Sequence, residues 1–358
     1  MILVVGGAGY VGSVLVAELL ERGYSVRVVD RLYFGDRGLF PVRDRVELVV
    51  ADMRRLEAQW FEGVQAVINV GGLSNDPTAE YNPTANFEMN TVAAVRLAEL
   101  ARANGVRRYV FASSCSIYDR GACEEEDDVV FDEEAEVHPR AAYAVSKYEA
   151  ERQLLAMNGP DFCPIILRKG TVYGFSPRMR FDLVVNTFVR DALTCGRILL
   201  YRGGEMWRPL VDVRDAARAY LACLSAEENL VRGEVFNVAY CNMRISELAL
   251  RVRETLRAAG ISVDVFPDYS YRAVRSYRVS SHKIQQRLGF RPMVGVEDAV
   301  RDMLRQLRQP GFDDLTHPRF ENLRWLRLLE EAESILGAPR SVFEAPSATP
   351  TLSLVRRT

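Results

Sequence analysis

The sequence has few of the features that mark secreted, metal-binding or membrane proteins. Its six cysteines, at positions 115, 123, 163, 195, 223 and 241, are scattered, and no two form a CxxC pair. We therefore expect reduced thiols in a cytoplasmic protein, with no disulfide framework and no metal site. No apolar run approaches the length that spans a bilayer. The chain begins directly with a strand-like segment, which leaves no room for a signal peptide.

An excess of charge of one sign is also missing. The net charge of the 358 residues is −2, which gives no reason to expect nucleic acid or an anionic membrane as a partner. Hydrophobic residues make up 48% and charged residues 26%, as in soluble globular proteins. A chain of this length can bury a large core, and two lobes are the natural expectation.

The first motif present is a glycine-rich turn close to the N-terminus. Residues 2–5 form a continuous apolar run, as expected for a buried parallel strand, and apolar residues at helical spacing follow the turn. Between them lie Gly6, Gly9 and Gly12 in the spacing G-x-x-G-x-x-G. A glycine turn that joins a strand to a helix is typical of dinucleotide-binding folds, in which the helix N-terminus binds the pyrophosphate.

The second predicted strand indicates which dinucleotide is bound. It spans residues 26–30 and ends at Asp30, about 20 residues after the glycines, where a carboxylate accepts hydrogen bonds from the adenosine ribose. A carboxylate there repels the 2′-phosphate of NADP, so NAD is favoured, and the adjacent Arg31 softens that preference.

Further apolar runs predict a parallel sheet. Strands are expected at residues 46–50, 66–70, 108–112 and 164–168, with long helices at 84–104 and 140–157. The alternation of strands and helices predicts an α/β fold: a Rossmann-like doubly wound parallel sheet, with a smaller mixed α/β substrate lobe at the C-terminal side.

Changes in pattern along the chain suggest where its parts begin and end. We expect a dinucleotide-binding domain at 1–170 and a substrate lobe at 171–310, with some chain returning to the first domain. Alternating apolar and charged residues at 320–336 predict an amphipathic helix within an added segment, 311–338, that packs on the body or on a partner chain. The last residues, 339–358, are rich in Pro, Ser, Thr and Ala and predict a mobile tail.

Small and polar residues follow several of the predicted strands. Asp52 follows the third strand, where an acid can accept a hydrogen bond from the adenine amino group, and Gly71 and Gly72 follow the fourth, where small residues let a cofactor pass close to the backbone. Hydroxyl groups from Ser113 to Tyr118 follow the fifth strand and should face the ligand crevice of an open parallel sheet. The acidic loop at 124–136 is expected to be solvated.

The pair Tyr143 and Lys147 is the candidate catalytic centre. The residues around it form helices well, so the two side chains are expected on one helix face, four residues apart. An ammonium beside a phenol favours the phenolate and lowers the tyrosine pKa, which makes a proton acceptor usable near neutral pH. Taken alone, such a pair also occurs on many solvated helices.

The second half of the chain supplies polar candidates for a substrate. Scattered arginines in a nearly neutral chain suit a ligand diphosphate, which guanidinium groups bind in bidentate fashion, although each one alone could equally lie on the surface. The candidates are Thr171, Tyr173, Arg178, Arg180, Asn186, Arg208, Arg275 and Arg278.

In their order along the chain, these features resemble the extended short-chain dehydrogenase/reductase family. Within it, the sequence is most similar to the nucleotide-sugar epimerase/dehydratase branch, from residue 1 to about 305. The shared patterns are GGAGYVG at residue 6, Ser-Ser-x-x-Ile-Tyr at 113–118, Tyr143-x-x-x-Lys147, Arg-Pro-Leu-Val-Asp-Val at 208–213, Phe-Asn-Val at 236–238 and Leu-Gly-Phe-Arg-Pro at 288–292.

The resemblance implies a role for each matching residue. Ser114 would hold the sugar oxygen, Tyr143 would take the hydroxyl proton, and Lys147 would bind the nicotinamide ribose and favour the Tyr143 anion, a bias to which the positive ring of NAD adds. The implied NAD contacts are Gly6, Gly9, Tyr10, Val11, Gly12, Asp30, Arg31, Asp52, Met53, Gly71, Gly72, Leu73, Asn90, Ser113, Tyr143, Lys147 and Thr171. The implied contacts to a nucleotide-diphosphate sugar are Ser74, Ser114, Cys115, Ser116, Thr171, Asn186, Arg208 and Arg275, with Arg208 and Arg275 as diphosphate clamps.

One departure from the family pattern bears on the reaction. Sugar 4,6-dehydratases of the family carry Asp-Glu directly after the catalytic Ser or Thr, whereas this chain has Cys115 and Ser116. Elimination then lacks its acid and base, which disfavours a dehydratase. What remains is 4-epimerisation through a transient 4-keto sugar, net reduction of a 4-keto sugar, or chemistry at a neighbouring carbon, namely 3- or 5-epimerisation or decarboxylation. Cys115 and Lys169 are the candidate extra acid and base for that last option.

Two other classes of function stay open. A regulatory protein that senses a dinucleotide could keep this fold without turnover, but such relatives usually lose the Tyr/Lys pair, which is intact here. A structural scaffold could act through the helices at 84–104 and 140–157. In the family these helices pair across a two-fold axis, so the resemblance implies a homodimer alongside catalysis.

Overall fold

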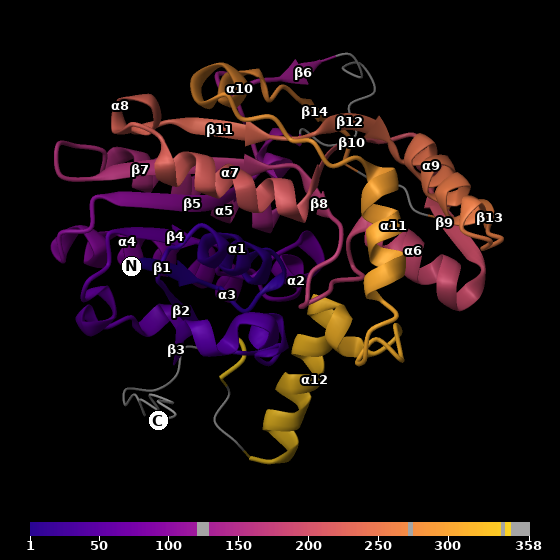
Figure 1. Cartoon of the computed structure of the whole chain (residues 1–358), viewed down its shortest axis with the longest axis horizontal. Coiled ribbons are helices and arrows are strands. Elements are labelled where there is room, and N and C mark those ends of the chain that lie inside the picture. Colours follow the sequence, from indigo (N-terminus) through magenta and orange to yellow (C-terminus); the bar gives the residue numbers. More distant parts are fainter. Residues whose placement is uncertain (120–128, 271–274, 338–340, 345–358) are drawn as a thin grey trace.

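The first domain is built on a seven-stranded parallel sheet. The computed structural model describes residues 1–119, 129–270, 275–337 and 341–344. The strands lie in the order β11-β7-β5-β4-β1-β2-β3 (Figure 1). Their bounds are β1 Ile2–Val5, β2 Val26–Asp30, β3 Val46–Val50, β4 Ala66–Asn69, β5 Arg108–Ser114, β7 Cys163–Lys169 and β11 Val235–Val238. The predicted strands are therefore present, and the Rossmann-like doubly wound fold is confirmed.

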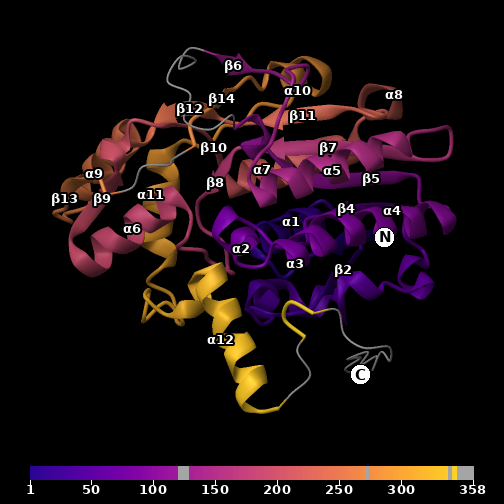
Figure 2. The ribbon, with the colours of Figure 1, turned by 180° about the vertical axis from the view of Figure 1, so that it is seen from behind.

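Helices cover both faces of this sheet. The helices α1 (Tyr10–Glu21) and α7 (Val213–Ser225) lie on one face, and α4 (Ala93–Ala103) and α5 (Ala142–Ala156) lie on the other, as the two opposite views show (Figures 1 and 2). The strands are apolar because both of their faces are buried under helices. Because all strands of this sheet are parallel, their carboxyl ends lie along one edge, and the predicted polar residues follow those ends.

The predicted helix at 84–104 is present and contains a π-helical turn. The segment contains α3 (Pro83–Phe87), a π-helical turn (Glu88–Val92) and α4, and a further short helix, α2 (Asp76–Tyr81), precedes it. The predicted helix is therefore confirmed, whereas its π turn was not predicted, because apolar spacing does not reveal one. Such turns are frequent at functional sites, and this one holds Asn90.

The second lobe has its own small sheet and apolar core. Strand β10 (Trp207–Asp212) pairs with β12 (Cys241–Arg244) and β8 (Thr171–Tyr173), and β13 (Asp264–Asp268) pairs with β9 (Arg197–Tyr201). Helices α6 (Val184–Cys195), α9 (Ile245–Ala258) and α11 (Val296–Gln306) contribute to this core. The chain returns to the first domain through α7 and β11. Other elements are β6 (Val130–Phe131), which pairs with β14 (Arg278–Val279), and helices α8 (Glu228–Val231) and α10 (His282–Leu288). Short 3-10 helices lie between several of these elements.

The C-terminal part of the chain crosses back to the first domain. Helix α12 (Asn322–Ile335) lies beside the β2 and β3 side of the molecule in both views (Figures 1 and 2). Beyond it, Val342 and Phe343 are buried against Leu73 and Leu326. The prediction of a mobile tail is therefore wrong for residues 341–344, because two apolar side chains anchor them. The tail residues 339–340 and 345–358 lie outside the described part, as do residue 338 of the added segment and residues 124–128 of the predicted acidic loop.

The described residues contain neither a membrane-spanning helix nor a cluster of metal ligands. No helix there is long and apolar enough to cross a membrane. Within the same ranges, no three His, Cys, Asp or Glu side chains gather in a way that could hold a metal ion.

Candidate active site

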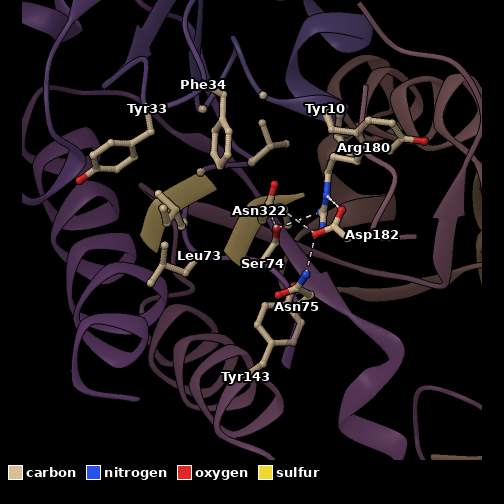
Figure 3. Close-up of a pocket in the computed structure, with 18 of the residues that line it drawn as sticks. Tyr10, Tyr33, Phe34, Leu73, Ser74, Asn75, Tyr143, Arg180, Asp182 and Asn322 are labelled. Atoms are coloured by element: carbon tan, nitrogen blue, oxygen red, sulfur yellow. Dashed lines mark hydrogen bonds and ion pairs between the residues drawn. The ribbon is translucent and has the colours of Figure 1, made fainter. Parts of the chain in front are cut away.

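A cavity of about 1000 Å³ lies at the carboxyl ends of the parallel strands. Its walls come from the glycine turn, the segments that follow β2, β3, β4 and β5, the substrate lobe and α12. Figure 3 shows part of this cavity, with Tyr143 on one side and Tyr33, Phe34 and Asn322 on others. Such a volume accommodates a dinucleotide and a second ligand.

The glycine turn has little room for side chains. Gly6 has φ +80°, and a Cβ there would lie 2.6 Å from the Cα of Gly71. A Cβ on Gly12 would overlap the carbonyl oxygen of Gly6, so turn and helix can approach only without side chains. Helix α1 begins after Gly9, with no side chain capping its N-terminus. Its first N–H groups therefore remain available for an anion at the cavity wall.

The carboxylate of Asp30 joins the glycine turn to the end of β2. It accepts hydrogen bonds from the backbone N–H of Ala8 (3.0 Å) and Leu32 (2.8 Å), and it lines the cavity. Burial raises the pKa of Asp30, an effect that these two N–H groups oppose. The carboxylate thus has defined orientation at the position expected for ribose recognition.

Asp52 is already paired with two arginines. Arg54 donates to both carboxylate oxygens, at 3.0 and 2.7 Å, and Arg31 forms a further ion pair with Asp52. The charge of Arg31 is therefore balanced by Asp52, which reduces its capacity to attract the 2′-phosphate of NADP. The sequence did not indicate the role of Arg54, because a buried arginine cannot be told from an exposed one in this pattern.

The three predicted catalytic residues line the same cavity. Tyr143 and Lys147 lie on α5, and Ser114 is the last residue of β5. The Lys147 amine lies 6.0 Å from the centre of the Tyr143 ring and 4.8 Å from that of Phe111. The Ser114 hydroxyl accepts a hydrogen bond from the N–H of Ser116 (3.1 Å). The fold thus brings together a phenol, an amine and a hydroxyl beside the glycine turn.

The predicted direction of the Tyr143 pKa shift was wrong for this ligand-free state. Burial raises the pKa of Tyr143 to about 12, and the negative charge of Asp76 adds to the shift. Burial also lowers the pKa of Lys147 to about 8. The positive charges of Arg180 and Arg275 oppose the rise at Tyr143 without reversing it. Tyr143 is therefore a phenol at neutral pH until more positive charge arrives.

Asn90 connects three elements around the cavity. From the π turn, its amide donates to the carbonyl of Leu73 (2.9 Å), the side chain of Asn86 (2.6 Å) and the hydroxyl of Ser146 on α5 (3.3 Å). Asn90 does not itself line the cavity. It fixes the loop after β4 to the helix that carries Tyr143.

A buried polar network lies behind the predicted catalytic residues. Glu151, on α5, forms a 2.7 Å ion pair with Arg168 of β7 and accepts a hydrogen bond from Ser113. Arg168 also donates to the Tyr118 hydroxyl (2.7 Å). The network fixes α5 to β5 and β7, and therefore fixes Lys147 one turn away. Glu151 and Arg168 belong to no recognised sequence pattern, so their buried ion pair could not be predicted from the sequence.

Lys169 contributes a second enclosed amine to the cavity. Its Nζ donates to the carbonyl of Ser113 (3.1 Å) and to the hydroxyl of Tyr220 (2.9 Å). Burial lowers the pKa of Lys169 to about 7, and the nearby charge of Lys147 adds to that. An amine in this state can accept or donate a proton near neutral pH.

The substrate lobe contributes both predicted clamp arginines. Arg208 and Arg275 line the cavity, and Arg275 forms an ion pair with Asp76 at the start of α2. Of the other predicted substrate contacts, Ser74, Ser116 and Thr171 also line it. The Ser74 hydroxyl accepts from Arg180 (2.9 Å) and from Asn322 (2.8 Å), as Figure 3 shows.

Several predicted contacts do not face the cavity. Asn186 accepts from the N–H of Gly174 (3.0 Å) and donates to the hydroxyl of Tyr10 (3.0 Å), so it braces two loops inside the lobe. Tyr10 does line the cavity, but its hydroxyl is bonded within the protein, because it donates to the carbonyl of Gly174 (2.7 Å). Tyr173 and Arg278 are also absent from the lining.

Cys115 is a buried thiol outside the cavity. Its sulfur donates to the carbonyl of Arg168 (3.1 Å), and burial raises the pKa of the thiol. The hypothesis that Cys115 acts as an acid or base beside the substrate is therefore not supported by its position or its ionisation.

The comparisons with known proteins agree with this fold. The NAD dependent epimerase/dehydratase family matches residues 2–239. A UDP-glucose 4-epimerase from Corynebacterium glutamicum is 26% identical over 313 residues, covering 81% of this chain and 90% of that protein. A UDP-N-acetyl-alpha-D-glucosaminuronate decarboxylase from Bacillus cytotoxicus is 24% identical over 325 residues, covering 86% and 97%.

The fold of this chain is also similar to that of a solved structure. The dTDP-glucose 4,6-dehydratase DesIV from Streptomyces venezuelae, determined with NAD bound, is similar with a TM-score of 0.74 and 26% identity, covering 86% of this chain and 98% of that one. The relatives catalyse epimerisation, decarboxylation and dehydration, so the reaction differs among proteins of this shape. The family match confirms the predicted resemblance and the expected cofactor. The chain belongs to the NAD dependent epimerase/dehydratase family.

Proposed function

We propose that this protein is an NAD-dependent nucleotide-sugar epimerase that acts through a transient 4-keto sugar. The observation that carries the proposal is the shared cavity. Ser114, Tyr143 and Lys147 line it together with the glycine turn, Arg208 and Arg275. A dinucleotide and a nucleotide diphosphate can therefore meet at one phenol.

The residues present fit NAD. The glycine turn leaves the space that a Cβ would fill, Asp30 lies at the ribose position, and Arg31 is balanced by Asp52. Arg178 adds a buried guanidinium that lines the cavity and has two nitrogens without a partner among the described residues, so an anion such as a phosphate would complete it. The chemistry that NAD supplies when bound is acceptance and return of a hydride at the sugar carbon.

The chain's own residues handle the proton. Ser114 holds the oxygen on carbon 4 of the sugar, and Tyr143 removes its proton as the carbon is oxidised. Tyr143 can do so only with added positive charge, because its pKa is about 12 without a ligand. Lys147 supplies part of that charge from the next helical turn and orients the nicotinamide ribose. Tyr143 then returns the proton when the ketone is reduced on its other face.

A dehydratase remains disfavoured by the residues that follow Ser114. Elimination requires an acid and a base at carbons 5 and 6, whereas Cys115 is a buried thiol and Ser116 a hydroxyl. DesIV has the same overall shape. Shape alone therefore does not distinguish the two reactions.

A second candidate is epimerisation at carbon 3 or 5, or decarboxylation, after the same oxidation. Lys169 favours it, because an enclosed amine with a pKa near 7 in the cavity is a suitable base for a carbon acidified by a neighbouring ketone. Net reduction of a 4-keto sugar is the alternative that uses the same residues but consumes NADH or NADPH.

Incubation with a panel of nucleotide sugars tests the proposal. UDP-glucose, UDP-glucuronic acid, UDP-N-acetylglucosamine and dTDP-glucose would be followed by NMR, with absorbance at 340 nm to detect net redox change. We expect inversion at carbon 4 of one sugar without net cofactor consumption. Stoichiometric NADH consumption would establish a reductase, and the loss of carbon dioxide or inversion at carbon 3 or 5 would establish the second candidate.

We also propose that the protein is a cytoplasmic homodimer. The helices implied in the family's dimer contact carry half-exposed apolar side chains: Phe87 of α3, Val92 of the π turn and Val145 of α5 are 41%, 52% and 39% exposed. Burial of this surface in a second copy would form a four-helix contact. Light scattering that gives a monomer at micromolar concentration would contradict it.

A further inference from the structure

The C-terminal cover is the part of the molecule that the proposed function leaves unexplained. We define it as α12 together with residues 341–344. Both pieces lie outside the stretch that matches the family, residues 2–239. Residues of α12, among them Asn322, Leu323 and Leu326, line the cavity that contains the glycine turn and Asp30.

The first turn of α12 is tied to the cavity by polar contacts. The Asn322 amide donates to the Ser74 hydroxyl (2.8 Å), its oxygen accepts from Arg178 (2.5 Å), and its backbone N–H donates to Asp182 (3.1 Å). Arg178 is 6% exposed and packs over the Phe34 ring, 3.7 Å from its centre. Asn322 therefore holds in place the buried guanidinium that lacks an anion.

The middle of α12 packs against the loop that follows β2. The Trp325 indole donates to the carbonyl of Tyr33 (2.7 Å), and Leu326 is 1% exposed against Leu73 and Met89. Tyr33 and Leu73 both line the cavity, next to the residues expected to contact the adenosine ribose and the nicotinamide side. Helix α12 thus bonds to the loop after β2 through Tyr33 and packs on the loop after β4 through Leu73, and both loops line the cavity.

Residues 341–343 are hydrogen-bonded to side chains near Asp52. Arg54, which holds Asp52, donates to the carbonyl of Phe343 (3.0 Å) and of Ser341 (3.3 Å). The Tyr33 hydroxyl donates to the carbonyl of Val342 (2.9 Å). Val342 and Phe343 are 2% and 5% exposed. Several bonds therefore join this segment to the side chains at the expected adenine position.

We propose that the C-terminal cover slows the release of NAD from its cleft. This inference rests on the proposed function for its rationale, whereas the measurement of NAD release does not depend on it. The cofactor of an epimerase is regenerated in each cycle, so a wall that keeps it bound carries no penalty for turnover, whereas a net reductase must exchange it. Residence time is set chiefly by the dissociation rate, and contacts that must break before exit lower that rate.

The test measures dissociation without any sugar substrate. Full-length protein loaded with radiolabelled NAD is mixed with excess unlabelled NAD, and the label retained is followed over time. Three altered proteins are compared: a chain that ends at Leu336, which keeps α12 but removes Val342 and Phe343, and the variants Trp325→Ala and Trp325→Phe. Ile335→Ala, at an α12 residue 77% exposed, is the matched control.

We expect release to be at least about tenfold faster in the shortened chain and in Trp325→Ala, and unchanged in Ile335→Ala. Trp325→Phe keeps an aromatic side chain but loses the hydrogen bond to the Tyr33 carbonyl, so it should show a smaller acceleration. This variant shows whether the effect of Trp325→Ala comes only from misfolding. Wild-type release rates in the shortened chain and in folded Trp325 variants would overturn the inference. Faster release in the shortened chain and in Trp325→Ala, together with no turnover of any nucleotide sugar by wild type, would overturn the proposed function and support the cover.

Discussion

Replacement of Lys169 by methionine tests whether this amine is neutral in the folded protein. The residue is enclosed at the cavity wall, and its pKa is lowered to about 7 by burial and by the charge of Lys147. In the unfolded chain a lysine titrates near ~10.4. Between these two values the unfolded chain binds one proton more than the folded protein does. The stability that wild type gains from losing this proton therefore rises with pH through that window and is absent below pH 7.

The expected magnitude follows from that window. Each pH unit within it changes the free energy of unfolding by about 1.4 kcal/mol for one proton. Between pH 6 and pH 9, wild type should thus gain about 2–3 kcal/mol that Lys169→Met cannot gain. Loss of the donor to Ser113 and Tyr220 adds a cost in the variant, but this cost does not depend on pH over the range.

Urea unfolding followed by circular dichroism at pH 6, 7, 8 and 9 measures the difference between the two proteins. Lys283→Met is the control for loss of a lysine side chain, because Lys283 pairs with Glu234 outside the cavity. A wild-type-minus-variant difference that stays constant within about 0.5 kcal/mol from pH 6 to pH 9 would refute the reasoning, since Lys169 would then be charged in the folded protein.

Three further substitutions test the site. Tyr143→Phe should lower turnover by about 10²–10⁴-fold while leaving NAD binding intact, as measured by kinetics and calorimetry; equal turnover would exclude Tyr143 as the base. Glu151→Gln leaves the buried Arg168 without its charge partner and should cost about 3–5 kcal/mol in urea unfolding, whereas a loss below 1 kcal/mol would contradict the buried pair. Gly72→Ala, at φ +120° and against the Asn90 amide, should displace the loop after β4 and weaken NAD binding by at least about tenfold in calorimetry.

The sequence was sufficient to predict the sheet and to predict that the candidate catalytic residues line one cavity. Apolar strands buried on both faces leave an unmistakable pattern, and parallel connection then places every strand end at one edge. Ser114, Tyr143 and the glycine turn therefore had to meet once the strands were located. The fold prediction depended on local pattern alone and did not need any single long-range contact.

Other features depend on contacts that local pattern does not encode. Asn186 carries a polar side chain in the right region, yet it bonds to Tyr10 and turns away from the cavity. Phe343 lies in a stretch of disorder-like composition, yet it is buried because Leu326 and Leu73 offer it an apolar surface. In both cases the outcome is decided by a partner more than 15 residues away, which the sequence pattern does not identify.

The pKa of Tyr143 also depends on contacts that the sequence pattern does not identify. Spacing alone correctly placed Lys147 on the cavity beside Tyr143, but a pKa shift is the sum of burial and of all nearby charges. Burial and Asp76 outweigh the arginines, so the ligand-free protein holds a phenol. The base must then form only when positive charge enters the cavity, and the oxidised nicotinamide ring is such a charge. In the proposed reaction, proton removal by Tyr143 is thereby coupled to the binding of the oxidised cofactor.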